Sequence, residues 1–178
     1  GAGKNGLIEL KDSIKSFGNN TSVNKESKYF KYNLAYNVIP QVDNFLDNAY
    51  TKEEMKVVWE VKKVLDDPSI KISVTAVRVP VIRSHAESIT LKFKNKVNNI
   101  SDIKEMLKNT EGVLLKDDIS NNIYPMPMTS THNNDVEVGR IRKNLIYEDY
   151  GIDMFISGDQ LLRGASYNAY EIFKRLLY

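Results

Sequence analysis

The sequence predicts an α+β domain in which helices cover a mixed, largely antiparallel sheet. One observation is the order of the hydrophobic patterns along the chain, which runs helix, strands, helix, strands, helix. A second is that two or more of the links between the predicted strands are compatible with hairpins. Together these features favour the α+β class. At 178 residues the chain is long enough for one well-formed core and too short for two comfortable domains, so a single domain is expected.

The first part of the chain predicts one helix and one extended segment. The helix spans residues 7–17, whose apolar side chains recur at helical spacing until Gly18 ends them. Residues 19–28 are polar and rich in turn-forming residues, which predicts a flexible loop. Residues 29–41 carry aromatic and β-branched side chains, which favours an extended segment that ends at Pro40.

A helix is also predicted for residues 51–65. Thr51 is an N-cap residue and Glu54 follows three positions later, which is the capping-box pattern. The apolar residues of one broad face are Met55, Val58, Trp59, Val61, Val64 and Leu65. Two strands are expected next, at 70–81 and 85–95. The second alternates apolar and polar residues, which predicts one buried face and one face in water.

The second half of the chain predicts a short helix, two strands and a terminal helix. The short helix covers residues 101–109 with Ser101 as its cap, and strands are expected at 135–149 and 151–157. From Asp159 onward the pattern is helical again. The residues of this helix that are expected to face inward are Leu162, Ala165, Ala169, Ile172, Phe173 and Leu176.

The composition limits the classes of partner. The chain has 25 basic and 23 acidic residues and a formal charge of +2, so long-range attraction to nucleic acid or to an anionic membrane surface is not indicated. No apolar run approaches the roughly 20 residues that a membrane span needs, and no leader is visible. The absence of cysteine excludes a disulfide, a thiolate metal site and a cysteine nucleophile within these residues, and it fits a cytoplasmic location. No metal site is expected.

Two side chains stand out in the stretch TAVRVPVIRSHAESITLKF, residues 75–93. Arg78 and His85 lie in a run that is otherwise mostly Val, Ile, Ala, Leu and Phe, and Pro80 between them marks a bulge or an edge. Burying a charge is costly unless it is paired, so both are expected to meet partners or a substrate. A satisfied core histidine and a strand-end arginine are the simpler interpretation. In the functional interpretation, the guanidinium of Arg78 binds a substrate carboxylate and His85 acts as a general base.

Other motifs have ordinary explanations beside functional ones. GAGKNG at residues 1–6 satisfies a glycine fingerprint for dinucleotides, but no strand precedes it, and a loop that leads into a helix explains it equally. Glu60 and Lys63 are spaced for an exposed ion pair on the helix at 51–65. His132 lies in a polar loop, and solvation accounts for it.

The stretch GRIRK, residues 139–143, places Arg140 and Arg142 near Gly139, where a backbone or a ligand can approach closely. A cross-strand ion pair is the alternative explanation. The nearby YPMPM, residues 124–128, has two prolines that stiffen a loop, and no chemistry follows from it.

The chain resembles the C-terminal, catalytic and dimerisation portion of the aspartate-semialdehyde dehydrogenase family. Seven stretches carry the resemblance in order, from the first residue nearly to the last: GAGKNG, YNVIPQVD, YTKEEMKVVWEVKKVL, TAVRVPVIRSHAES, YPMP, DVEVGRIRK and MFISGDQLLRGASYNA. The resemblance implies an enzyme that reduces β-aspartyl phosphate with NADPH to aspartate semialdehyde and phosphate, in the biosynthesis of lysine, threonine and methionine. It also implies a homodimer or tetramer and a cysteine thiolate that forms a thioester.

The resemblance implies roles for individual residues. His85 would be the general acid and base, Arg78 would hold the substrate α-carboxylate, and Glu60 would pair with its amino group. Lys63 would help to bind phosphate. The residues implied near NADP are Gly1 and Gln160.

The sequence also departs from the family pattern. The Asn-Cys-Ser/Thr nucleophile motif and the substrate-binding glutamine that precedes it in the family are absent, and so is the nucleotide-binding domain. We therefore expect residues 1–157 to form the substrate-binding and dimerisation domain, and residues 158–178 to form a helix that belongs with the absent nucleotide domain. The chain alone is expected to be inactive and to self-associate. The alternatives are a non-enzymatic dimerisation or scaffold module and a reductase of another acyl phosphate.

Overall fold

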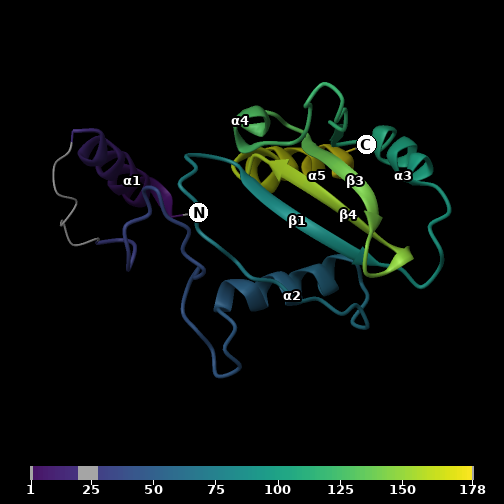
Figure 1. Cartoon of the computed structure of the whole chain (residues 1–178), viewed down its shortest axis with the longest axis horizontal. Helices are drawn as coiled ribbons and strands as arrows, with labels where there is room; N and C mark the ends of the chain where they lie inside the picture. The colour runs from purple at the N-terminus through teal and green to yellow at the C-terminus, as the bar shows by residue number, and fades with distance from the viewer. Residues whose placement is uncertain (1, 20–27, 178) are drawn as a thin grey trace. The chain divides into compact units, whose positions relative to one another are not determined.

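The computed structural model describes residues 2–19 and 28–177 (Figure 1). The chain divides into two compact units, residues 1–82 and 83–178, and each is described by itself. The loop predicted for residues 19–28 therefore falls mostly outside the described residues. The expected boundary between residues 157 and 158 stays a prediction.

The first unit is built on helix α1 (Gly3–Gly18) and a set of turns that packs against it. Its buried apolar cluster consists of Leu10, Phe30, Leu34, Ala35 and Ile39. The helix begins at Gly3, four residues before the predicted start, so most of GAGKNG is helical rather than a loop. The reason lies in packing. A Cβ placed on Gly6 would lie 2.5 Å from the Cβ of Ala2 and 3.1 Å from the ring of Phe30, so glycine permits the close approach.

Helix α2 (Lys52–Val64) confirms the predicted capping box. The Thr51 hydroxyl accepts a hydrogen bond from the N–H of Glu54 at 3.2 Å, and the Glu54 carboxylate accepts one from the N–H of Thr51 at 2.7 Å. Thr51 is fully buried, which explains why the start of this helix is so well defined. Its apolar face is only partly covered, since Trp59, Val64 and Leu65 are exposed.

The predicted strand at 70–81 is wrong. In this segment the only ladder contact is an isolated bridge in which the N–H and C=O of Arg78 both bond to Ile39, at 2.8 and 3.0 Å. The segment 29–41 likewise forms turns rather than an extended strand. The valines at 77, 79 and 81 are exposed, because the described residues of this unit leave them uncovered. A run of mostly apolar residues indicated a strand here, but a strand needs a neighbour to pair with along its length.

The second unit contains a four-stranded sheet in the order β1-β4-β3-β2, which confirms the predicted α+β class and the mixed, largely antiparallel sheet. Its strands are β1 (His85–Lys92), β2 (Val113–Leu115), β3 (Val136–Asn144) and β4 (Glu148–Gly158). The pairs β1·β4 and β3·β4 are antiparallel, and β2·β3 is parallel. Helix α5 (Tyr167–Leu177) lies behind the strands in the view of Figure 1.

The predicted strand at 135–149 ends earlier than expected because a tight turn follows it. The side-chain oxygen of Asn144 accepts hydrogen bonds from the N–H groups of Ile146 and Tyr147, each at 2.9 Å. The chain therefore reverses into β4 at Glu148. The core of this unit is formed by the central strands, where Val138, Ile141 and Ile152 are buried.

The helices of the second unit differ in detail from the prediction. Helix α3 (Ile100–Lys108) is capped by Asn99 instead of Ser101, and a short helix α4 (Pro127–Ser130) was not predicted. The terminal segment opens with a π-helical turn η1 (Leu162–Ser166) before α5 begins.

The face of the terminal helix that its pattern turns inward is not buried in the described residues, and the expectation that this helix belongs with the absent nucleotide domain stays a prediction. Ile172, Phe173 and Leu176 are 54%, 59% and 80% exposed, because the described elements of this unit leave that side of α5 uncovered.

Candidate functional site

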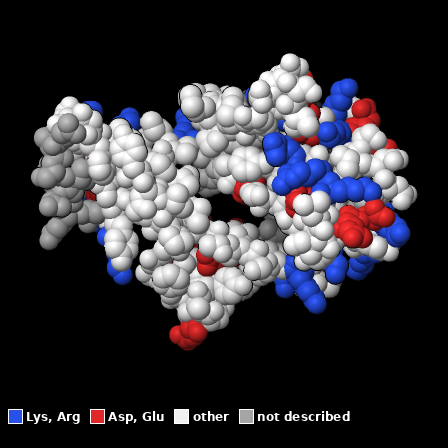
Figure 2. Space-filling model, viewed as in Figure 1, with Lys and Arg blue, Asp and Glu red and all other residues white. Residues whose placement is uncertain are grey.

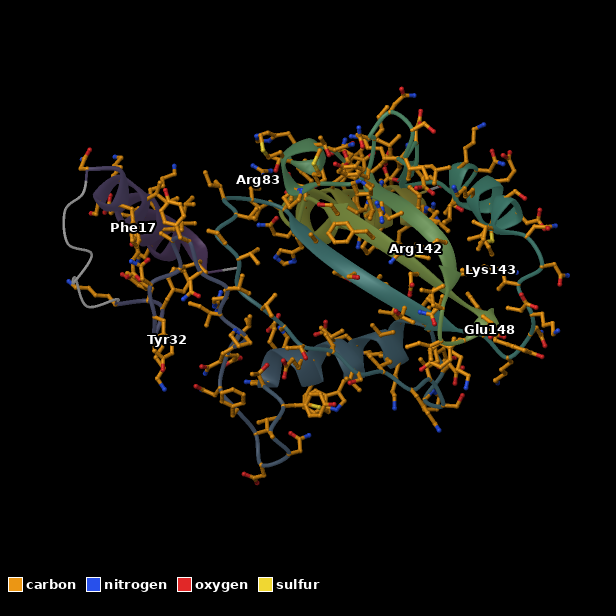
Figure 3. The ribbon with its side chains drawn as sticks, in the orientation of Figure 1. Phe17, Tyr32, Arg83, Arg142, Lys143 and Glu148 are labelled. Atoms are coloured by element: carbon orange, nitrogen blue, oxygen red, sulfur yellow. The ribbon has the colours of Figure 1, made fainter. Side chains whose placement is uncertain are left out.

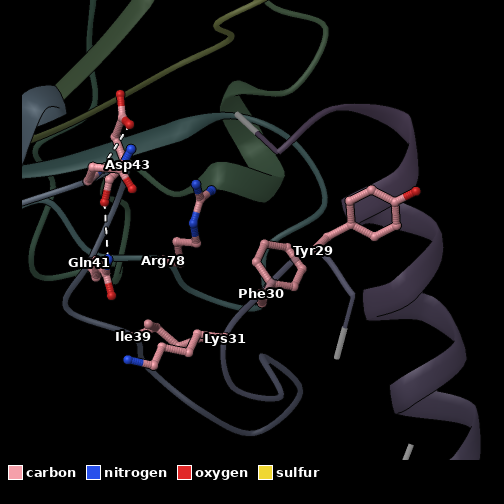
Figure 4. Close-up of a pocket in the computed structure, with 8 residues that line it drawn as sticks. Tyr29, Phe30, Lys31, Ile39, Gln41, Asp43 and Arg78 are labelled. Atoms are coloured by element: carbon pink, nitrogen blue, oxygen red, sulfur yellow. Dashed lines mark hydrogen bonds between the residues drawn. The ribbon is translucent and has the colours of Figure 1, made fainter. Parts of the chain in front are cut away.

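Arg78 lines a hollow of about 230 Å³ in the first unit. Its backbone is fixed by the bridge to Ile39, and its guanidinium lies over the ring of Phe30, 5.5 Å from the centroid. Figure 4 shows the side chain running between the Phe30 ring on one side and Gln41 and Asp43 on the other. Arg78 is half-buried rather than enclosed. A planar cation in a partly apolar hollow is suited to a carboxylate.

Glu60 and Lys63 lie on helix α2, and both are exposed. The ion pair on this helix is instead Lys56 with Glu53, at 3.1 Å, and no ion pair joins Glu60 to Lys63. The ordinary explanation from spacing, an ion pair between these two side chains, is therefore wrong. Both side chains remain accessible to a ligand.

Glu54 connects α2 to the segment that carries Arg78, and sequence reasoning assigned it no role beyond the cap. Besides closing the capping box, its carboxylate accepts the N–H of Ala76 at 2.9 Å. The N–H of Thr51 is the main reason that the pKa of Glu54 lies below its usual range, although burial opposes the shift. The helix and the segment of Arg78 are thus fastened to one buried charge.

His85 is the first residue of β1 and is exposed, so the expectation that it is enclosed among apolar strand residues is wrong. The reason is topological, because β1 is an edge strand and its residues are exposed or half-exposed. Its backbone is nevertheless held firmly. The carbonyl of His85 accepts a hydrogen bond from the Ser157 hydroxyl at 2.9 Å, and that hydroxyl also contacts Ser130 at 2.8 Å.

A buried polar network precedes His85 in the chain. Arg83, labelled in Figure 3 just ahead of β1, donates from Nε to Asp159 at 2.8 Å. Burial alone would raise the pKa of Asp159. Hydrogen bonds from the N–H groups of His132 and Leu161 and from Arg83 outweigh burial and keep the pKa below its usual range. Gln160 accepts the N–H of Ser84 at 2.8 Å through its side-chain oxygen.

The remaining predicted positions are distributed as follows. Gly1 lies outside the described residues. The side chain of His132 is exposed, as expected from its polar loop, although its backbone contacts Asp159.

Arg142 forms a cross-strand ion pair with Asp153 at 3.6 Å, which agrees with the alternative explanation of GRIRK. A Cβ at Gly139 would lie 1.9 Å from the carbonyl oxygen of Lys116, so a backbone does approach closely there.

The surface charges of the second unit are mixed in sign. Figure 2 shows Lys and Arg side chains gathered over the sheet, with acidic side chains among them. Lys143 and Lys96 both pair with Asp149, at 2.6 and 3.8 Å. A second hollow, of about 490 Å³, is lined by Lys92, Phe93, Lys94 and Tyr150. Because acids accompany the cations, this surface is not a uniform site for polyanions.

Each unit thus carries its own part of the predicted site. The first brings Glu60 and Lys63 onto one helix and fixes Arg78 through Ile39 and Glu54. The second brings Gln160 to the residue beside His85. Sequence reasoning missed Asp159 as a partner of this region. The available signal is an acid placed directly after an apolar strand.

Two further properties concern the described residues as a whole. Across residues 2–19 and 28–177, none of the helices combines the length and the apolar character that crossing a bilayer requires. In the same residues no group of three or more His, Asp or Glu side chains is arranged to hold a metal ion.

A family profile described as "Semialdehyde dehydrogenase, dimerisation domain" matches residues 1–163. The chain therefore belongs to this family of dehydrogenase domains. Its relatives carry a more specific name. Aspartate-semialdehyde dehydrogenase of Campylobacter jejuni is 41% identical over 177 residues, which are 99% of this chain and 51% of the relative. The Bacillus subtilis protein of the same name is 38% identical over 181 residues, covering 99% and 52%.

A solved structure agrees with these relatives. Aspartate semialdehyde dehydrogenase II of Vibrio cholerae, complexed with ASA, superposes with a TM-score of 0.90 at 34% identity, and the match covers 98% of this chain and 50% of that one. The chain spans about half the length of the curated relatives that it matches. The resemblance seen in the sequence motifs is thus confirmed for the family and for the fold.

Proposed function

We propose that this chain is the substrate-binding and dimer-forming half of an NADP-dependent aspartate-semialdehyde dehydrogenase. The complete protein would reduce β-aspartyl phosphate to aspartate semialdehyde and phosphate, in the route to lysine, threonine and methionine. The observation that carries the proposal is the match of nearly the whole chain to relatives with this one name. The position of Arg78 in a partly apolar hollow supports it, because that setting favours a small carboxylate.

The first unit would hold the substrate. Arg78 would bind the α-carboxylate in a bidentate manner, which its planar guanidinium favours over the ammonium of a lysine. Glu60 would pair with the amino group, and Lys63 would contribute to the phosphate site. Both side chains are exposed on α2 and no ion pair joins them, which supports these roles.

The second unit would supply the acid and base. His85 would take the proton of a thiol and later serve the oxygen of the thiohemiacetal, because an imidazole titrates near neutral pH. Its exposure leaves the ring accessible, while Ser157 fixes the backbone behind it. The chain has no cysteine, so the thiolate would come from outside these residues.

NADPH would supply the hydride. Gln160 lines neither of the two hollows described above, and its side-chain oxygen already accepts the N–H of Ser84. The proposal therefore places the cofactor mainly on residues beyond this chain, with Gln160 at its margin. The enzyme would act in the cytoplasm as a homodimer or tetramer. The family description and the exposed apolar residues of α5 support self-association.

The test uses the full-length protein and phosphate-dependent oxidation of aspartate semialdehyde, followed through NADPH formation. His85→Asn is expected to lower kcat by on the order of 100-fold or more, as loss of a general base does. His132→Asn is the matched control because these are the two histidines of the chain, and asparagine tolerates the φ of +67° at that position. An undiminished rate in His85→Asn would refute the assigned role.

Arg78→Lys tests the substrate site in the same assay. It is expected to raise KM for the semialdehyde by about 10-fold or more, since lysine cannot reproduce the bidentate contact. Arg142→Lys, which alters an exposed cross-strand pair, is expected to leave KM unchanged. The 178-residue chain by itself is expected to show no turnover.

Two alternatives give different results. A scaffold module would leave the full-length protein inactive towards any semialdehyde. A reductase of another acyl phosphate, such as N-acetylglutamyl phosphate, would turn over that substrate faster than aspartyl phosphate, so the comparison of the two substrates separates the candidates.

A further inference from the structure

Asp159 directly follows strand β4 and has no exposed side-chain surface. Its Oδ2 accepts hydrogen bonds from Nε of Arg83 and from the N–H of His132, both at 2.8 Å. Its Oδ1 accepts the N–H of Leu161 at 2.9 Å. These donors come from the segment before β1, the segment after α4 and the segment before η1. One buried charge therefore fastens three segments at the end of the sheet where β1 begins.

Ser84 stands between Arg83 and His85 in a backbone conformation that serine seldom adopts, with φ at +74°. Its N–H donates to Gln160, the residue after Asp159, at 2.8 Å. Its hydroxyl contacts the Thr131 hydroxyl at 2.9 Å. Such a conformation persists only where surrounding contacts over-determine it, and these conformations cluster at functional sites. Here the contacts come from the residues that flank the partners of Asp159.

His85 is consequently fixed on both sides of its Cα. The strained turn of Ser84 precedes it, and its own carbonyl is held by Ser157 while the strand register pairs it with Gly158. The residue is exposed. The direction in which the imidazole leaves the backbone is therefore set by the buried network.

We propose that Asp159 is a positioning residue for His85, acting through the Arg83–Ser84 turn. The inference rests on the proposed function, because it assumes that His85 is the acid and base of that reaction and that the network orients it. A general base must lie within hydrogen-bond reach of its proton, and a misplacement of about 1 Å can lower a rate by on the order of 100-fold. Asp159 itself touches neither substrate nor cofactor in this role.

Asp117 offers a matched comparison with the same kind of surroundings. Its side chain is 1% exposed and accepts the N–H groups of Arg140 at 2.8 Å and Ile141 at 3.2 Å, and it pairs with Lys104 at 2.8 Å. Like Asp159, it is a buried carboxylate with two backbone donors and one cation. It bonds to β3 on the side of β2, whereas β1 is the opposite edge strand. A purely structural role would make the two acids respond alike to the same substitution.

The first measurement compares Asp159→Asn with Asp117→Asn in the full-length protein. Asparagine has the same shape as aspartate, but an NH₂ group replaces one carboxylate oxygen. That NH₂ group is a donor and would face the N–H groups that the oxygen accepted. Asp159→Asn is expected to lower kcat by about 10- to 100-fold with KM changed less than about threefold, while Asp117→Asn leaves kcat within about threefold. Arg83→Lys, which keeps the charge, is expected to retain more of kcat than Asp159→Asn does. Equal values of kcat in the two aspartate variants would overturn the inference.

The second measurement needs no turnover and uses the 178-residue chain itself. The imidazole and backbone amide signals of His85 are recorded by NMR and assigned with the His85→Asn variant. Asp159→Asn is expected to shift or broaden these signals, and Asp117→Asn to leave them in place. If Asp159→Asn does not fold, Thr131→Val takes its place, with the same expectation for His85. Signals of His85 that superpose on those of the unaltered chain would overturn the inference.

The two measurements separate this inference from the proposed function. A full-length protein without dehydrogenase activity, combined with shifted His85 signals, defeats the proposed reaction and leaves the positioning of His85 supported. Normal activity in Asp159→Asn, combined with activity lost in His85→Asn, defeats the positioning role and leaves the reaction supported.

Discussion

Replacing Glu54 by glutamine removes the carboxylate that joins helix α2 to the segment of Arg78. Glu54 is 5% exposed, and its carboxylate accepts hydrogen bonds from the N–H groups of Thr51 at 2.7 Å and Ala76 at 2.9 Å. Glutamine retains one acceptor oxygen, so one N–H keeps a partner and the other faces the amide NH₂. The substitution therefore tests whether a single buried charge holds two parts of the substrate-binding unit together.

The size of the effect follows from the number of bonds lost. A hydrogen bond to a charged group contributes about 1.5–3 kcal/mol, and the bond that remains becomes a weaker neutral one. We expect Glu54→Gln to lower the free energy of unfolding of the first unit by about 2–3 kcal/mol. Stabilities of whole domains are only about 5–15 kcal/mol, so the loss is large. With a urea dependence of about 1–3 kcal/mol per molar, the midpoint falls by roughly 1–2 M.

The fluorescence of Trp59 reports this transition without added probes. It is the only tryptophan of the chain and lies on α2. Glu53→Gln is the matched control, since the neighbouring carboxylate is 39% exposed and forms an exposed pair with Lys56. That variant is expected to shift the midpoint by less than about 0.3 M. Equal midpoints for the two variants would refute the assignment of a tethering role to Glu54.

The effect depends on pH in a defined direction. The pKa of Glu54 in the folded chain lies below its ordinary value of 4.5, chiefly because the backbone N–H of Thr51 bonds to the carboxylate. A lowered pKa contributes stability above the ordinary value and loses it as the pH falls through the folded value. The difference between the unaltered chain and Glu54→Gln is therefore expected to be largest above about pH 5 and to narrow below about pH 4.5.

Two further substitutions probe the sheet by thermal melting. Gly139→Ala is expected to lower the stability by about 3 kcal/mol, because the new Cβ would collide with the backbone of Lys116, whereas Gly158→Ala meets no atom closer than 3.5 Å and serves as its control. Glu137→Gln is expected to cost about 2–3 kcal/mol by breaking a buried pair of 2.6 Å with the same lysine. Asp149→Asn, which disrupts exposed pairs with Lys143 and Lys96, is expected to leave the melting temperature within about 1 °C. Similar melting of either variant and its control would contradict the burial arguments.

The local elements of this chain follow from local signals. Thr51 and Glu54 lie three residues apart and define a helix start by contacts within one turn, so the sequence predicts it and the structure confirms it. Alternation in 85–95 predicts β1 for the same reason, since the side-chain period is a property of the strand itself, but the buried face that it also predicts is wrong because every residue of this edge strand is exposed or half-exposed. The family motifs are also short local strings, so the family resemblance follows from the amino-acid sequence alone.

Burial and partnership, in contrast, are decided by residues far apart in sequence. Nothing local distinguishes the valines near Arg78, which remain exposed without a paired strand, from those of a true strand. The exposure of His85 depends on β1 being an edge strand. The charge that fixes the backbone before His85 belongs to Asp159, which lies 76 positions after Arg83 in the chain. The sequence by itself determined the helix and strand periods, the family and the absence of a thiol nucleophile. Only the tertiary structure decided which charges are buried and what they hold, because a pairing between distant segments is selected by the packing of the whole unit and leaves no period in the sequence.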